Sequence, residues 1–382
     1  MDAQIRNPSH MSASQRSIAL DVLKGIGCAM MVIPHTGLNI HGYERFRIWG
    51  ILAPVLFYAV SAITASFQAH KYPPRSFFLT YAFLFLLGFS FNRITDPGFL
   101  NEIEFDILQF IAVGSCIIYL LERYLRPSQW VYLVLGFASA AAKPLIQSAL
   151  DGAAFPGANL IVPPGIFPIF PWMFLFFLGL FCWRAENRFN LGLGIGSTLA
   201  LIGLWLSGYP LDIQNKEDMS LSVFLLCCSM LFLSFYLARA LPKLFNNKRL
   251  MAPLSFLGRN SLLYLYVHFP TILLLKHFRI VHRIEFINTH PYLIWALALA
   301  LTYLIMFALL PLGRIGWLAR VFDFIPTWVV MVALVFGAGF FIPNIYIVQL
   351  AEVLLGLVIA IFFHRLASTL KKQPLPSTTP DP

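Results

Sequence analysis

The chain has 382 residues, of which 59% are hydrophobic and 12% are charged. Soluble globular domains carry about 25% charged residues, so this composition excludes a soluble fold and indicates a polytopic membrane protein. The net charge of +10 would suit a nucleic-acid partner. The basic residues, however, are divided between the two sides of a membrane in the way that topology requires, so we expect no nucleic-acid binding.

Apolar segments of helix length follow one another along the whole chain. Each is close to the roughly 20 residues that a spanning helix needs, and the shortest would be tilted, broken or partly re-entrant. We therefore expect an all-α, polytopic integral membrane protein with about 12 transmembrane helices, or about 10 at the fewest. The segments cover residues 18–40, 46–69, 76–91, 106–121, 129–149, 166–183, 191–207, 219–238, 260–275, 290–311, 327–342 and 344–363.

The distribution of charge predicts the orientation of these helices. When the N-terminus is placed in the cytoplasm and the segments alternate, most Lys and Arg fall inside and most loop acids fall outside, which follows the positive-inside rule. Both termini are then cytoplasmic, in what we expect to be a bacterial inner membrane. The first apolar run lacks a small-residue cleavage site, so we interpret it as a retained helix. We divide the chain into a cytoplasmic N-terminal segment (1–15), one transmembrane domain (16–365) and a proline-rich, disordered cytoplasmic tail (366–382).

The first apolar segment contains charged side chains. Burying a charge in the membrane is energetically costly, so these residues indicate a functional role. Lys24 and His35 are eleven residues apart, which is three helical turns plus about 20°, so they share one face about 16 Å apart. Asp21 lies on the same stripe and forms a predicted ion pair with Lys24. Pro34 removes a backbone donor, so we expect the helix to bend or end at His35.

Other polar residues also stand out in apolar segments. Gln109 needs a partner one turn into its helix, either a substrate or a neighbouring helix. Trp172 would stack on a sugar ring or, as we favour, lie in the interfacial aromatic belt. His268 is expected to line a cavity. Lys143 and Glu352 are buried charges that would pair with each other or line a path.

The sulfur and histidine content predicts neither a disulfide framework nor a metal site. No histidines have the spacing of metal ligands on a helix, such as His-x-x-x-His, so we expect no metal. The cysteines are odd in number and all lie in apolar segments, which indicates packed free thiols. They are Cys28, Cys116, Cys182, Cys227 and Cys228.

Five partial motifs, in order between residues 16 and 270, resemble the transmembrane acyltransferase superfamily. The resemblance is closest to the heparan-alpha-glucosaminide N-acetyltransferase-like group, with acyltransferase family 3 as a relative. The chain departs from that pattern at Lys24 and Phe110, where the family has Arg, and at Ala62, where it has Gly; Lys keeps the charge but loses the bidentate fork. The motifs are Leu20-Asp21-x-x-Lys24-Gly25 with His35, Pro54 with Ser61-Ala62, Leu108-Gln109, Phe167-Pro168-x-x-Pro171-Trp172, and Gly258-Arg259-Asn260-Ser261 with Tyr264 and His268.

The resemblance implies transfer of an acyl group, expected to be acetyl, from cytoplasmic acetyl-CoA to a hydroxyl or amine of a glycan at the outer face. His35 and His41 are the candidate catalytic bases. Asp21 is too far along the helix to orient His35, so an orienting acid would come from Glu44, Glu102, Glu104 or Asp106. Arg16, Lys24 and Arg259 would meet the phosphates of the donor. Asn260 and Ser261 would contact its pantetheine amides or, as we favour, cap a helix.

Plainer interpretations stay open beside these roles. His35 would then line a kinked helix, His41 would be a solvated loop residue, and Arg16 and Lys24 would be interfacial anchors. One rival function is a transporter or flippase, and another is a relative that has lost catalysis. The expected partners are membrane lipids and a glycan or glycolipid acceptor, with a homodimer as a further possibility. In the transporter, the path would consist of His35, Lys143, His268 and Glu352.

Overall fold

The computed structural model describes residues 18–36, 46–95, 104–150, 157–213, 216, 218–277, 290–342 and 344–372. Within these ranges every regular element is a helix, which confirms the predicted all-α membrane fold. The described residues contain 9 helices that are long and apolar enough to cross a membrane, together with two shorter apolar helices, Ile169–Arg184 and Ile325–Val335. Every predicted apolar segment contains at least one helix, and the number of crossings stays a prediction.

The main helices begin and end close to the predicted segments. The exceptions are α13, which lies before the predicted segment 260–275, and the C-terminal helix, which continues beyond residue 363. The long elements are α1 (Ile18–Thr36), α3 (Leu52–Lys71), α4 (Pro74–Thr95), α5 (Ile107–Leu120), α6 (Gln129–Leu150), α9 (Phe174–Arg184), α10 (Asn187–Leu206), α11 (Leu221–Ala240), α13 (Ala252–Arg259), α14 (Ser261–His277), α17 (Pro291–Leu309), α19 (Ile325–Phe341) and α20 (Ile345–Lys372). The short elements are η2 (Ile48–Ile51), η4 (Leu121–Leu125), α7 (Ala158–Ile161), α8 (Ile169–Trp172), α12 (Pro242–Phe245), η5 (Leu310–Arg314) and α18 (Gly316–Val321).

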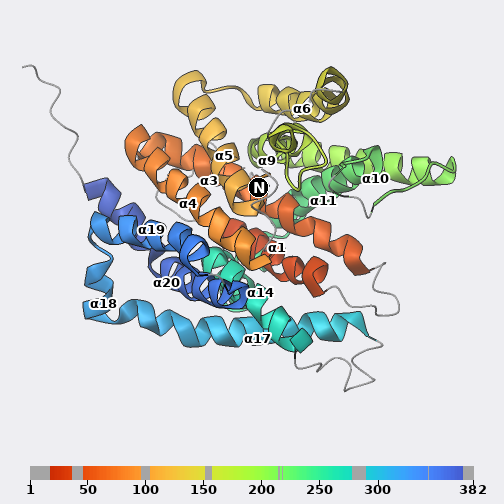
Figure 1. The fold of residues 1–382 in the computed structure, drawn as a ribbon. Helices are drawn as coiled ribbons and strands as arrows, with labels where there is room; N and C mark the ends of the chain where they lie inside the picture. The colour runs from red at the N-terminus through yellow and green to blue at the C-terminus, as the bar shows by residue number, and fades with distance from the viewer. Residues whose placement is uncertain are drawn as a thin grey trace, which may run out of the picture.

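Helix α3 lies at the centre of the bundle: 78% of the residues in its most apolar stretch are buried inside the protein. It packs against α1, α5 and α9. Helices α6 and α10 lie at the edge, where only 11% of the most apolar stretch of each is buried, and α10 pairs with α11 on one side of the molecule (Figure 1). On the other side, α17, α19 and α20 cover α4 and α14 (Figure 1). The functional candidates therefore lie between a central group of helices and a C-terminal layer.

The bundle has two chemically different ends. We call the first the basic end, defined by Asp21, Lys24, Arg184 and Arg259; there Arg259 lies 3.6 Å from Asp21, and Arg184 lies 2.6 Å from Glu122. We call the second the histidine end, defined by His35, His268 and Lys276. There, Lys276 Nζ donates to the His35 carbonyl oxygen at 3.0 Å. The cytoplasmic location of the basic end stays a prediction.

Two motif glycines allow α1 and α13 to touch along their backbones. A Cβ atom at Gly258 would lie 2.9 Å from the Asp21 carbonyl carbon and closer still to its oxygen. A Cβ at Gly25 would likewise overlap the backbone of Leu254. Glycine lacks this atom, so the helices approach closely. The contact places Arg259, the last residue of α13, beside α1.

The two buried charges that the sequence left unexplained have separate partners. Lys143 pairs with Asp218 at 2.9 Å, and Glu352 pairs with Arg93 at 3.2 Å. The prediction that Lys143 and Glu352 pair with each other is therefore wrong. The reason is topological, because α4 is the helix that packs against α20.

The remaining sequence predictions on the fold have mixed outcomes. All five cysteines are free, as predicted. Helix α20 continues to Lys372, so the first residues of the predicted disordered tail are helical, and residues 373–382 lie outside the described residues. The N-terminal segment 1–15 also lies outside them.

Candidate functional site

A cavity of about 660 Å³ lies between the central helices and the C-terminal layer. This volume is within the range of pockets that bind cofactors and other small molecules. Its walls come from α1, α3, α4, α5, α13 and α14 on one side and from η5 and α20 on the other. The lining residues are Lys24, Met31, Phe57, Ser61, Thr64, Gln68, Thr80, Tyr81, Leu84, Ile107, Leu108, Ile111, Arg259, Asn260, Ser261, Leu262, Leu263, Leu265, Leu310, Gly313, Arg314, Ala360, Ile361, Phe363 and His364.

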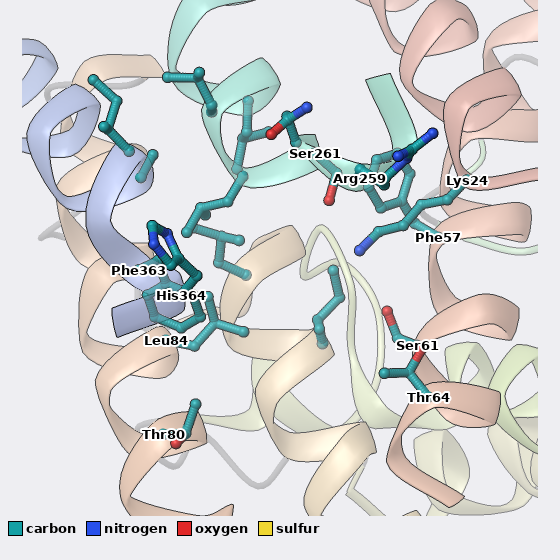
Figure 2. Close-up of a pocket in the computed structure, with 18 of the residues that line it drawn as sticks. Lys24, Phe57, Ser61, Thr64, Thr80, Leu84, Arg259, Ser261, Phe363 and His364 are labelled. Carbon is teal, nitrogen blue, oxygen red and sulfur yellow. The ribbon is translucent and has the colours of Figure 1, made fainter. Parts of the chain in front are cut away.

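The part of the cavity nearest the basic end is lined by nitrogen-bearing side chains. Lys24 and Arg259 lie on one wall, and His364 lies on the facing wall (Figure 2). Lys24 Nζ is 5.8 Å from the centroid of the Phe57 ring, a cation–π distance. The Arg259 guanidinium donates to Ser255 Oγ at 2.8 Å and lies 3.6 Å from Asp21. These contacts hold two fixed cations beside the cavity, which suits a polyanionic ligand.

Neutral polar groups line the wall beside these cations and beyond them, on the side away from the histidine end, because the segment that leads into α3 lies against Pro34 and the last turn of α3 lies against Glu122. Ser61, Thr64 and Gln68 are spaced along one face of α3, and the Tyr81 hydroxyl on α4 donates to Gln68 Oε1 at 3.1 Å. Figure 2 places Ser61 and Thr64 on the same helix, away from Arg259. Hydroxyl and amide groups can bond to the amides of an extended ligand without a net charge.

Asn260 and Ser261 lie at the junction of α13 and α14. Asn260 Nδ2 donates to the Phe256 carbonyl oxygen at 2.9 Å, so its side chain bonds back to α13. Its backbone carbonyl accepts from the Tyr264 N–H at 2.8 Å and so starts α14. Both residues also line the cavity. The two predicted roles, helix capping and ligand contact, are therefore compatible at this position.

The far part of the cavity is apolar and ends close to the histidine end. Met31 and Leu265 line it there, together with residues of the first turn of α5. Met31 is one turn before His35 on α1, and the carbonyl oxygen of Leu265 lies 3.0 Å from His268 Nδ1. The cavity therefore extends from Lys24 and Arg259 to Met31 and Leu265, which separate it from His35 and His268.

The two histidines lie together although they are far apart in the sequence. The ring centroids of His35 and His268 are 5.5 Å apart, and His35 also makes an edge contact with Phe269 at 5.6 Å. His268 is completely buried and stacks on Tyr264 with centroids 5.0 Å apart. The sequence predicts that His268 lines a cavity, but neither His268 nor His35 lines this one. Their proximity to each other could not be read from the spacing within either helix.

Gln109 bridges two helices, one of its two predicted roles. With the Asn92 amide in the orientation that satisfies its neighbours, Gln109 Nε2 donates to Asn92 at 2.9 Å, and Asn92 donates to Asp106 at 3.0 Å. Gly88 makes room, because a Cβ there would overlap the Gln109 side chain. Asp106 caps α5 by accepting from the Ile107 N–H at 2.6 Å. Burial raises the pKa of the Asp106 carboxyl above its usual range, against the opposing effects of that bond and of Lys216.

Trp172 does not lie in an interfacial belt, so the favoured prediction is wrong. Its side chain has 0% exposure and packs edge-on against Tyr58 and Phe167. Hydropathy does not distinguish an aromatic ring that faces lipid from one that faces protein. Trp172 is part of the core beside α3, and it does not line the cavity.

Several predicted site residues cannot be placed. Arg16 and His41 lie outside the described residues, as do two of the four acids proposed to orient His35, Glu44 and Glu102. The other two acids have different partners: Glu104 accepts from the Ile166 N–H at 3.1 Å, and Asp106 caps α5. Within the described part of the chain, no acid forms an ion pair with His35. The described residues also contain no group of three or more potential metal ligands, and the absence of a metal stays a prediction.

Arg314 and His364 line the cavity and were not among the predicted site residues. Arg314 was counted only as a topological charge, and His364 carried no motif. Their sole signal in the sequence is a position near the predicted cytoplasmic ends of late helices. Only the packing of α20 against α4 brings them to the wall opposite Lys24.

Comparison with known families gives one match. A family described as heparan-alpha-glucosaminide N-acetyltransferase, catalytic, matches residues 16–203. This region contains Lys24, His35 and the polar face of α3, whereas Arg259 and His268 lie beyond it. No curated protein and no solved structure matches the chain.

Proposed function

We propose that this chain transfers an acetyl group from acetyl-CoA to a glycan, because residues 16–203 match the catalytic family of heparan-alpha-glucosaminide N-acetyltransferase. The coarser statement, that the chain is an acetyltransferase-like integral membrane protein, follows from the family match and the apolar helices. The finer proposal rests on the geometry of the cavity, which runs from Lys24 and Arg259 to the layer beside His35.

The basic end of the cavity suits the nucleotide part of the donor. Lys24 and Arg259 would bind its phosphates, with Arg314 and His364 on the facing wall. The apolar far part, which Met31 and Leu265 line, suits the arm that carries the acetyl thioester, whereas the hydroxyls and amides of α3 and α4 lie at the nucleotide end with the cations. Lys24 and His35 are about 16 Å apart along α1, so the two parts of the site contact opposite ends of one long substrate.

At the histidine end, His35 would act as the general base. Its imidazole would take the proton from an acceptor amine or hydroxyl, and the freed nitrogen or oxygen would attack the thioester carbonyl carbon. The carbon–sulfur bond breaks, and the protonated imidazole returns its proton to the departing sulfur, which leaves as the free thiol. In an alternative acyl-histidine route, the His35 nitrogen would attack the thioester carbon and the thiolate would leave. The acceptor would then attack the acetyl-imidazole, the new carbon–nitrogen bond would break, and the acceptor's proton would balance the released thiolate.

The acceptor would be an amine or hydroxyl of a glycan or glycolipid at the outer face. The family name specifies an α-glucosaminide, which supplies the first probe to use. We place the basic end in the cytoplasm of a bacterium because the positive-inside rule and a cytoplasmic donor agree on that orientation. Membrane lipids surround the apolar exterior in this arrangement, and a homodimer stays a prediction.

The transporter alternative has less support than acetyl transfer. It needed a path through His35, Lys143, His268 and Glu352, but two of these residues are held in ion pairs outside the cavity. The remaining pair of histidines lies at the end of a cavity with cations at its other end. This arrangement suits a substrate that is anionic at one end and reactive at the other.

The test uses purified protein in proteoliposomes with acetyl-labelled acetyl-CoA and methyl α-glucosaminide. We expect labelled product and an equal amount of free thiol. H35A should lower kcat by roughly 100-fold or more, since general bases contribute about 10² to 10⁴. H70A is the matched control, because His70 lies at the basic end and is not a cavity residue. Full activity in H35A would contradict the assignment of the base.

A separate binding measurement tests the donor site. K24A and R259A should each weaken acetyl-CoA binding by about tenfold, the loss of roughly one charge-assisted contact. R188A is the control, because Arg188 is exposed on α10 and pairs with Glu186 away from the cavity. Equal affinity in all three variants would refute the phosphate site and leave the role of His35 untouched.

A further inference from the structure

The imidazole ring of His268 on α14 has a fixed orientation beside His35, the proposed general base. The residue is completely buried, two turns into its helix, where it stacks on Tyr264 with an angle of 4° between the rings. The stacking and the helix together hold the plane of the imidazole. His268 lies beyond the matched residues 16–203, so the family match says nothing about it.

The hydrogen-bond partners of His268 determine where its proton lies. Nδ1 is 3.1 Å from the carbonyl oxygen of Tyr264 and 3.0 Å from that of Leu265. A carbonyl oxygen only accepts hydrogen bonds, so Nδ1 must carry the proton in the neutral ring. Nε2 is then left with its lone pair. This is the usual way in which a protein sets one ring nitrogen of histidine as an acceptor.

The acceptor nitrogen of His268 has no partner among the described residues, although it is buried. Buried acceptors are nearly always satisfied, and an exception calls for a functional explanation. The nearest ring with a donor to offer is that of His35, whose centroid is 5.5 Å away. Catalytic hydrogen bonds are often long without substrate and tighten when it binds.

The side chains around His35 and His268 do not occupy the position of a hydrogen bond between the two rings. Phe269 packs against both histidine rings, and Lys276 bonds to the backbone carbonyl of His35 and not to its ring. In the described part of the chain, no acid forms an ion pair with either ring, and the charged side chains that act on His35 are Lys216 and Lys276. Leu265 connects His268 to the cavity, because it lines the cavity wall and its carbonyl faces Nδ1.

We propose that His268 is a positioning residue for His35 in acyl transfer, an inference that rests on the proposed function. His268 Nε2 accepts a hydrogen bond from one ring N–H of His35, which leaves the lone pair of the other His35 nitrogen facing the acceptor group. When His35 takes the acceptor's proton, its two N–H groups are held by His268 and by the reacting atoms. The proton then passes from His35 to the departing sulfur, and His268 gains and loses none.

The first variant, H268N, separates this role from a structural one. An asparagine amide can occupy the Nδ1 position and still donate to the carbonyls of Tyr264 and Leu265, but it has no atom at Nε2. We expect unchanged acetyl-CoA affinity and donor KM, with kcat lowered by about 100-fold. T271V is the matched control on the same helix, because the Thr271 hydroxyl bonds only to the Val267 carbonyl within the described residues. It should retain wild-type kcat.

A second variant, H268G, keeps the proposal falsifiable if H268N does not fold. Added imidazole should fill the space of the lost ring and restore part of kcat in H268G, but not in H35A. A folded H268N with wild-type kcat would overturn the proposal, and so would an H268G that binds acetyl-CoA but gains nothing from imidazole. Failure of the proposed function is a different result, in which the wild-type protein itself transfers no acetyl group.

Discussion

Replacing Gly258 with alanine should damage both the fold and the donor site, because α1 and α13 touch at this residue. A Cβ at position 258 would lie 2.9 Å from two backbone atoms of α1 and closer to the Asp21 carbonyl oxygen. Cβ atoms essentially never lie within 3.0 Å of a neighbour, so α13 must move away from α1 by about 1 Å. No flexible side chain can absorb this change, since the obstacles are backbone atoms.

The size of the effect follows from that displacement. Overpacking a buried contact costs typically about 1–3 kcal/mol. The same movement would lengthen the contact of 3.6 Å between Arg259 and Asp21 beyond the 4.0 Å limit of an ion pair. Arg259 is the last residue of α13 and would move with it, so acetyl-CoA affinity should fall by about tenfold, or about 1.4 kcal/mol.

The assay measures the melting temperature and the acetyl-CoA dissociation constant of G258A in the same detergent. G196A is the control, because Gly196 lies in α10 with no atom within 4 Å of the added Cβ. That variant should gain stability by up to about 1 kcal/mol, since alanine is the better helix former. If G258A matches the wild type in both measurements, α1 and α13 do not pack as described.

Two further predictions concern charge and ligand. E352Q should destabilise the protein by about 3–5 kcal/mol, because it leaves the buried Arg93 without its carboxylate. The control is D323N, which breaks the more exposed ion pair with Arg365 and should destabilise the protein by less than about 1 kcal/mol. Equal melting temperatures for the two variants would contradict this ranking. Acetyl-CoA at 100 times its dissociation constant should stabilise the wild type by about 2.7 kcal/mol, and the same concentration should stabilise R259A less; an identical shift would place the donor away from Arg259.

Much of the fold could be predicted from local properties of the chain. Apolar segments of about 20 residues identify membrane helices because length and hydropathy are local quantities. The stripe on α1 could also be predicted, since helical spacing fixes the faces of Lys24 and His35. The motifs group Arg16, Lys24, Arg259, Asn260 and Ser261 as one donor site; the last four line the same cavity, Arg16 lies outside the described residues, and donor binding stays a prediction.

The rest depends on which helices pack together, and spacing within one helix does not contain that information. The partner of Glu352 is 259 residues away on α4. Arg314 and His364 join the cavity only because the C-terminal layer covers α4. The approach of His268 to His35 depends on α14 packing against α1. Trp172 was misplaced because burial against protein and burial in lipid leave the same apolar signal.

A structure of the protein with bound acetyl-CoA would test the central claim most directly. We expect the phosphates to lie between Lys24, Arg259 and His364, and the thioester to point past Met31 toward His35. A nucleotide bound at the histidine end, or outside the cavity, would contradict it.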